Sequence, residues 1–126
     1  MKVFHIILLT SATLFSGCQS VDMMRAKPAS IELSSTNKAK TIAGCIALDL
    51  EEVFREALDN NTRLHTRPIS GGYSIWLEQG VALGESTAMV VDVTDTPSGS
   101  VTSFHNDLTP MYLERTNKVI RNCQGG

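Results

Sequence analysis

The stretch YSIWLEQGVALGESTAMVVDVTDTPSGSVTSFH, residues 73–105, decides the fold. Apolar and polar side chains alternate over residues 73–78, and β-branched residues concentrate over residues 87–93. Both patterns are typical of β-strands. Turn-forming residues fill positions 94–99, and residues 100–105 have the character of a third strand. Because such a short turn cannot make a parallel crossover, we expect antiparallel pairing.

Helical patterns flank these strands on both sides. Over residues 38–60, apolar side chains recur at spacings of three and four, and Cys45 lies on that apolar face. Thr109 and the proline after it are typical of a helix start, and the amphipathic pattern that follows includes Cys123. The order helix–strand–strand–strand–helix predicts a two-layer α+β domain over residues 38–124, with a three-stranded antiparallel sheet packed on two helices.

The size and charge of the chain narrow the class of protein. The chain has 126 residues, with 11 Lys and Arg against 13 Asp and Glu, and a formal net charge of −2. This length allows one small domain, and a hydrophobic content of 42% is enough for a packed core. The charge gives no basic surface of the kind that nucleic-acid binders carry, so we expect no nucleic-acid partner.

The N-terminus has the pattern of a targeting segment. Lys2 precedes an apolar run over residues 3–15, and two small residues lead to Cys18. This arrangement is typical of a secretory signal, and the run is shorter than the ~20 residues of a transmembrane helix. The stretch LFSGC, residues 14–18, resembles the lipobox of bacterial lipoproteins. An ordinary secretory signal with an incidental cysteine is the alternative.

The lipoprotein resemblance implies a membrane anchor. Residues 1–17 would be removed as a signal peptide, and Cys18 would carry a diacylglycerol on its sulfur and an acyl chain, such as palmitate, on its amino group. At ~0.8 kcal/mol per buried methylene, several acyl chains would hold the protein permanently in the membrane. Gln19 replaces the aspartate that resembles an inner-membrane retention signal, which implies the outer membrane, with the domain facing the periplasm.

Between the anchor and the domain we expect a flexible tether. Residues 18–37 comprise the lipidated cysteine and a segment rich in Ser, Lys, Thr and Ala that lacks sustained periodicity. Met23 and Met24 form a small apolar step that either touches lipid or lies in an exposed linker.

With Cys18 assigned to the anchor, two cysteines remain. Cys45 and Cys123 are an even pair in an oxidising compartment, which predicts a disulfide. The bridge would close a loop of 79 residues, and constraining the unfolded chain in this way is worth about 4 kcal/mol. Two reduced thiols are the alternative, and no CxxC or HxxxH spacing supports a zinc site.

Motifs that could carry catalysis do not have the required context. Residues 84–88, GESTA, match a nucleophile elbow only superficially, because a strand follows the serine instead of preceding it. His65 and His105 have no free nucleophile to activate. The spacing of the acidic residues in the strands and turns does not match a calcium loop, and turn chemistry explains them better: Asp92, Asp95 and Asp107. We therefore predict no catalytic, cofactor-binding or metal-binding residue and no cofactor.

Two surfaces are candidates for partner contact. Ser74, Trp76 and Glu78 share one face of the first strand, opposite to the apolar Tyr73, Ile75 and Leu77. An antiparallel sheet can leave one face open, so we expect Trp76 to lie exposed or at a contact site, although the reverse parity would bury it. The other candidate is an acidic helical face, which as a solvated surface needs no partner: Glu51, Glu52, Glu56 and Asp59.

These features together predict a membrane-anchored bacterial lipoprotein. We expect its domain to be non-enzymatic and to bind another envelope component, in the first place a protein. One alternative is a tethered periplasmic enzyme or enzyme inhibitor. Another is a lipoprotein that blocks an outer-membrane receptor, since small lipoproteins resembling this size class do so in phage exclusion.

Overall fold

The computed structural model describes residues 19–58, 61–81 and 84–125. The predicted signal peptide and the lipidation site Cys18 lie outside the described residues, as does Asp59 of the acidic face.

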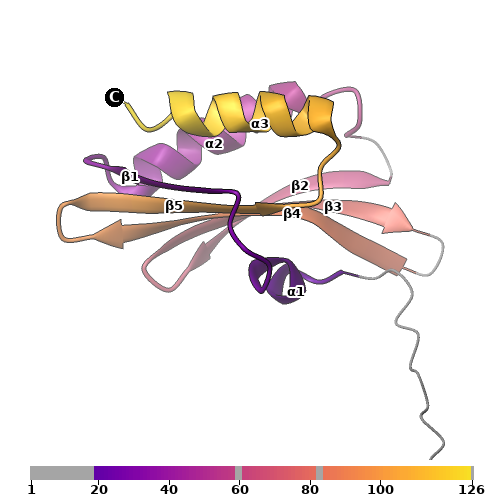
Figure 1. The fold of residues 1–126 in the computed structure, drawn as a ribbon, viewed down its shortest axis with the longest axis horizontal. Coiled ribbons are helices and arrows are strands. Elements are labelled where there is room, and N and C mark those ends of the chain that lie inside the picture. The colour runs from indigo at the N-terminus through magenta and orange to yellow at the C-terminus, as the bar shows by residue number, and fades with distance from the viewer. Residues whose placement is uncertain (1–18, 59–60, 82–83, 126) are drawn as a thin grey trace, which may run out of the picture.

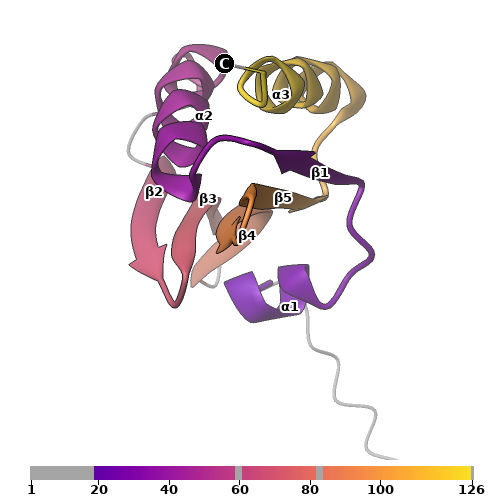
Figure 2. The same ribbon diagram turned by 90° about the vertical axis from the view of Figure 1, so that its left-hand side faces the viewer.

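The described residues form an α+β domain around a five-stranded antiparallel sheet (Figure 1). The strand order across the sheet is β1-β5-β4-β3-β2. The elements follow along the chain as α1 (Val21–Arg25), β1 (Ile31–Ser35), α2 (Ala39–Val53), β2 (Thr62–Ile69), β3 (Gly72–Val81), β4 (Gly84–Thr96), β5 (Gly99–Asn106) and α3 (Pro110–Asn122). Helices α2 and α3 cover one face, and α1 lies on the opposite face (Figure 2).

The α+β class is confirmed, but the three-stranded sheet is wrong. The three predicted strands lie within β3, β4 and β5, and the two predicted helices correspond to α2 and α3. Two further strands, β1 and β2, form the edges of the sheet. Strand β2 was missed because Pro68 and its exposed arginines hide the strand pattern, and edge strands tolerate such residues.

The segment for which we predicted a flexible tether, residues 18–37, carries α1 and β1 over its described part. Strand β1 pairs with β5, and Ile31 lies opposite Phe104 in the register. The Ser30 N–H also donates a hydrogen bond of 2.8 Å to the carbonyl of Phe104. Ile31 is only 6% exposed, so burial of its side chain draws this segment onto the domain.

The core lies between the sheet and the helices α2 and α3. Alternate residues of β3 and β4 point into it, together with one residue of β5 and the apolar face of α2. The following side chains from these four elements are all essentially inaccessible: Ile42, Ile46, Leu50, Ile75, Leu77, Met89, Val91 and Phe104. The strand parity predicted for β3 is therefore correct for Ile75 and Leu77, while Tyr73 is half-buried.

The predicted disulfide is confirmed. Cys45 of α2 is bonded to Cys123 at the end of α3, with 5.8 Å between their Cα atoms. The bridge joins the middle of α2 to the end of α3, while Phe54 and Tyr112 stack with ring centroids 5.1 Å apart where α2 ends and α3 begins.

Candidate functional site: the Trp76 surface and the free edge of β2

Trp76 lies at the centre of a polar surface on the sheet face opposite to α2 and α3. His65 of β2 is its register partner, and the two rings stack with centroids 4.9 Å apart. The guanidinium of Arg67 lies 5.5 Å from the centroid of the Trp76 ring, within the range of a cation–π interaction. The contacts with His65 and Arg67 leave Trp76 half-buried.

Two carboxylates extend this surface towards β4. Glu78 Oε2 lies 3.2 Å from His65 Nε2, close enough for an ion pair when the imidazole is protonated. A hydrogen bond from Glu85 lowers the pKa of Glu78, and the same bond, together with the charge of Glu78, raises the pKa of Glu85. The hydrogen bond therefore favours the ionised form of Glu78 and the protonated form of Glu85. We call the whole set the Trp76 surface: Arg63, His65, Arg67, Trp76, Glu78 and Glu85.

Ser74 does not belong to the Trp76 surface, although we predicted it beside Trp76 at a candidate contact site. Its side chain is 1% exposed because α1 covers this part of the sheet. Its hydroxyl oxygen accepts a hydrogen bond of 2.9 Å from Arg25, whose guanidinium also binds Asp92. The hydrogen bond to Asp92 is the main cause that raises the pKa of Arg25.

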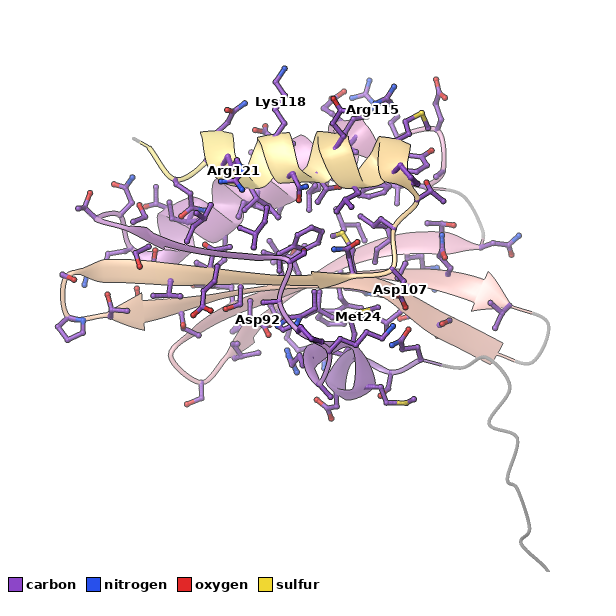
Figure 3. All side chains as sticks on the ribbon, viewed as in Figure 1. Met24, Asp92, Asp107, Arg115, Lys118 and Arg121 are labelled. Atoms are coloured by element: carbon purple, nitrogen blue, oxygen red, sulfur yellow. A yellow bond between two sulfur atoms is a disulfide. The ribbon has the colours of Figure 1, made fainter. Side chains whose placement is uncertain are left out.

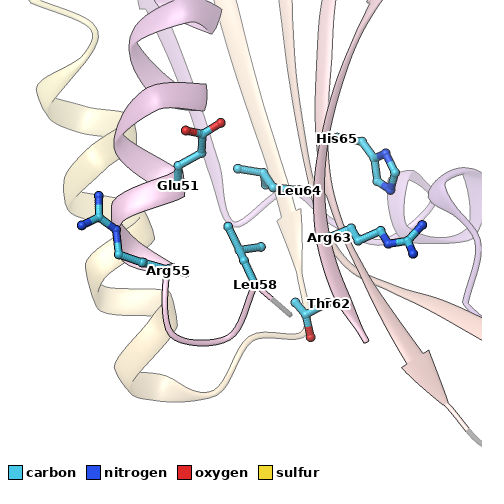
Figure 4. A pocket seen from close by; sticks show the side chains of 7 residues that line it. All are labelled: Glu51, Arg55, Leu58, Thr62, Arg63, Leu64 and His65. Carbon is cyan, nitrogen blue, oxygen red and sulfur yellow. The ribbon is translucent and has the colours of Figure 1, made fainter. Parts of the chain in front are cut away.

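A groove of about 600 Å³ lies on the other side of β2, next to α2 (Figure 4). The side chains of Leu58 and Leu64 lie between α2 and β2, and Glu51 and Arg55 line the helix side. Figure 4 shows Arg63 and His65 on the side of β2 that faces away from α2. The groove is mixed in character: Leu58 and Leu64 are its apolar residues, and Arg63 and His65 line both the groove and the Trp76 surface.

The outer edge of β2 pairs with no described strand. Pro68 lies opposite Tyr73 and has no N–H, so this pair is not hydrogen-bonded across the ladder. Bonded and non-bonded pairs alternate in an antiparallel ladder, so the backbone groups of Thr62, Leu64 and Thr66 also point away from β3. These groups can accept and donate hydrogen bonds to a further strand.

The other residues singled out from the sequence make contacts within the fold. Nδ1 of His105 lies 2.7 Å from the carbonyl of Lys27. Val90 and Trp76 lie between His105 and His65 in the register of the sheet, so the two histidines are not brought together. Asp95 accepts a hydrogen bond of 2.9 Å from the N–H of Ala39 at the start of α2, and Asp107 forms an ion pair with Lys27.

The residues of the remaining sequence motifs also take part in contacts within the domain. In the GESTA stretch, Ser86 Oγ accepts a hydrogen bond from the backbone of Gln19. On the acidic face of α2, Glu52 is paired with Arg55. The carboxylate of Asp49 is close to both Cys45 and Cys123, but their sulfurs are bonded to each other and are not thiolate ligands.

Comparison of this chain with known protein families, characterised proteins and solved structures gives no match. Among the described residues, no helix is long and apolar enough to cross a bilayer.

Proposed function

We propose that the chain is a bacterial lipoprotein, anchored through Cys18 in the outer membrane, whose periplasmic domain is a non-enzymatic module that binds another envelope protein. The LFSGC stretch supports the anchor. The disulfide between α2 and α3 supports an oxidising compartment such as the periplasm.

The observation that carries the binding role is the free edge of β2, which borders both the groove at Leu58 and Leu64 and the Trp76 surface. An extended segment of the partner would add to the sheet as a sixth strand, using the outward backbone groups of Thr62, Leu64 and Thr66. Its side chains would alternate between the two faces of the sheet. One set would enter the groove beside Leu58, and the other would lie beside Arg63, His65 and Arg67 on the Trp76 surface.

Charge suggests what such a segment contains. Arg63 and Arg67 are both exposed on β2 and project towards the Trp76 surface. Acidic side chains on that face of the partner would complement them, while apolar side chains on the other face would pack on Leu58 and Leu64 in the groove. The proposed partner segment is therefore extended, with acidic and apolar residues in alternation.

A proline substitution on the free edge tests this mode of binding. Thr66→Pro removes one outward N–H and keeps the bonds from β2 to β3, as Pro68 already does two residues further on. Thr66→Ala is the matched control, because it shortens the side chain and keeps the N–H. Photo-crosslinking from a benzoylphenylalanine at Arg63 in intact cells gives the readout.

We expect a discrete adduct with one envelope protein, abolished by Thr66→Pro and kept by Thr66→Ala. Mass spectrometry should place the cross-link in an extended acidic segment. The binding mode is refuted if Thr66→Pro leaves the adduct unchanged, or if the same adduct forms from a probe at Lys118 on α3. Cys18→Ser should remove fatty acid from the protein and release it from the membrane fraction, which tests the anchor separately.

A further inference from the structure

The residue that follows Cys18 is already part of the folded domain. The backbone N–H of Gln19 donates to Ser86 Oγ at 3.2 Å, and its carbonyl accepts a hydrogen bond of 2.7 Å from the N–H of Thr87. The next residue, Ser20, caps α1 by accepting from the N–H of Met23 at 3.1 Å. These hydrogen bonds fix both residues that precede α1, so no flexible segment separates Gln19 from the helix.

Helix α1 is itself fixed to the sheet. Met24 is completely buried against it, and the Arg25 guanidinium binds Asp92 through two hydrogen bonds of 2.7 and 3.0 Å. These contacts hold the N-terminal segment on the face of the sheet opposite to α2 and α3 (Figure 2). The position of Gln19 is thus determined by the fold of the domain.

We propose that the domain sits directly on the lipid bilayer, through a seat formed by Gln19, Met23 and Val81. This inference rests on the proposed lipidation of Cys18. Consecutive Cα atoms are about 3.8 Å apart, so Gln19 cannot be further than one residue from the anchored cysteine. The headgroup layer on each side of a bilayer is about 5–8 Å thick, so Gln19 lies within or just above it.

The chemistry of the seat suits a lipid surface. Met23 is 52% exposed on α1, and Val81 is 43% exposed at the end of β3. Val81 lies on β3, the strand next to β4, to which Gln19 is bonded, and two residues, or about 7 Å, further along the hairpin than Gln79, the register partner of Ser86. Exposed apolar side chains beside an anchor can enter the headgroup region at little cost.

The opposite side of the molecule differs in character. Figure 3 shows Arg115, Lys118 and Arg121 on α3, across the sheet from Met24 and Asp92. The seat therefore directs α3 away from the bilayer, with its basic side chains in solvent.

Methionine oxidation in the lipidated protein tests the seat without altering the domain. Met23 and Met111 are 52% and 53% exposed, so an oxidant in solution should reach them about equally in the domain alone. The lipidated protein is added to preformed vesicles of phosphatidylethanolamine and phosphatidylglycerol and treated with peroxymonosulfate, a charged oxidant. Peptide mass spectrometry then follows sulfoxide formation at each methionine.

The matched control carries an insertion of about eight Gly and Ser residues between Cys18 and Gln19, which lets the domain move by about 15 Å from the anchor. We expect Met23 to oxidise at least about fivefold more slowly than Met111 in the unmodified lipidated protein. In the insertion variant the two rates should be the same within about twofold.

The intact mass of the purified protein shows whether Cys18 carries lipid, which distinguishes a failure of the anchor from a failure of the seat. If the purified protein carries no lipid on Cys18, the anchor is wrong and the seat falls with it. If the lipid is present and Met23 oxidises as fast as Met111, the seat is wrong while the anchor stands. Equal protection of Met23 in both proteins also overturns the seat, because direct attachment to the anchor would then have no effect.

Discussion

Replacing Met24 by alanine should strongly destabilise the domain. Met24 is completely buried between α1 and the sheet, and the substitution removes its three side-chain atoms beyond Cβ. At ~0.8 kcal/mol for each buried methylene-sized group, plus part of the cost of the cavity, the free energy of unfolding should fall by about 2–3 kcal/mol. For a domain of this size the corresponding drop in Tm is about 10 °C.

The neighbouring residue provides the control. Met23 is 52% exposed, so Met23→Ala should change the free energy of unfolding by less than about 0.5 kcal/mol. Both variants are measured by urea unfolding followed by far-ultraviolet circular dichroism, with the disulfide intact. If Met24→Ala is as neutral as Met23→Ala, residues 19–37 do behave as a flexible tether, and the reasoning from α1 is refuted.

Three further predictions concern other parts of the fold. Replacing both cysteines of the α2–α3 disulfide by alanine should lower the free energy of unfolding by about 4 kcal/mol in urea titrations, and a much smaller loss would show that the bridge is not formed. In carbon-13 NMR titrations the pKa of Glu85 should lie above the usual 4.5 and that of Glu78 below it; Glu85→Ala should bring Glu78 back towards 4.5. The contribution of Glu78 to stability is therefore present above pH 4.5 and is lost as the pH falls through its folded pKa, whereas that of Glu85 is lost as the pH rises through its own. Gly99 has a φ of 155°, and a Cβ there would lie 1.9 Å from the carbonyl oxygen at the end of β1, so Gly99→Ala should cost at least about 2 kcal/mol and speed hydrogen exchange in β1. The control Gly44→Ala, in α2 with open space around it, should instead stabilise by about 0.5–1 kcal/mol, and equal effects of the two changes would contradict the close approach.

The sequence predicted the strands in which burial of one face of the sheet produces a regular pattern of apolar side chains. Strands β3, β4 and β5 lie at the middle of the sheet, and burial on one face gives them clear apolar positions such as Ile75 and Leu77. The edge strands lack this signal. Strand β1 has five residues, of which Ile31 and Leu33 alternate with polar neighbours, and this is too short a pattern to distinguish from coil.

Helix α1 could not be predicted from local sequence at all. A helix of five residues is not stable by itself, because the cost of nucleation exceeds what so few hydrogen bonds return. It forms because Met24 and Arg25 find partners on the sheet, in particular Asp92, which is far away in the sequence. The absence of local periodicity was therefore mistaken for flexibility.

The surroundings of Trp76 were predicted only in part for a similar reason. The parity of β3 correctly put Trp76 and Glu78 on the face away from α2 and α3, but it carried no information about α1, which covers Ser74. His65 and Arg67 were not connected with Trp76, because β2 had not been recognised as its neighbouring strand. A hairpin signal was present in the Ser70–Gly71 turn, where Gly71 adopts a φ of 75°.

The pairing of β1 with β5 has a consequence for how the chain folds. A chain is made from its N-terminus, so Ile31 is available long before Phe104, its partner across the ladder. Contacts between such distant residues slow folding, because a long loop must close before they form. Strand β1 must therefore remain unpaired until nearly the whole domain has been synthesised, and this edge of the sheet cannot close before β5 is in place.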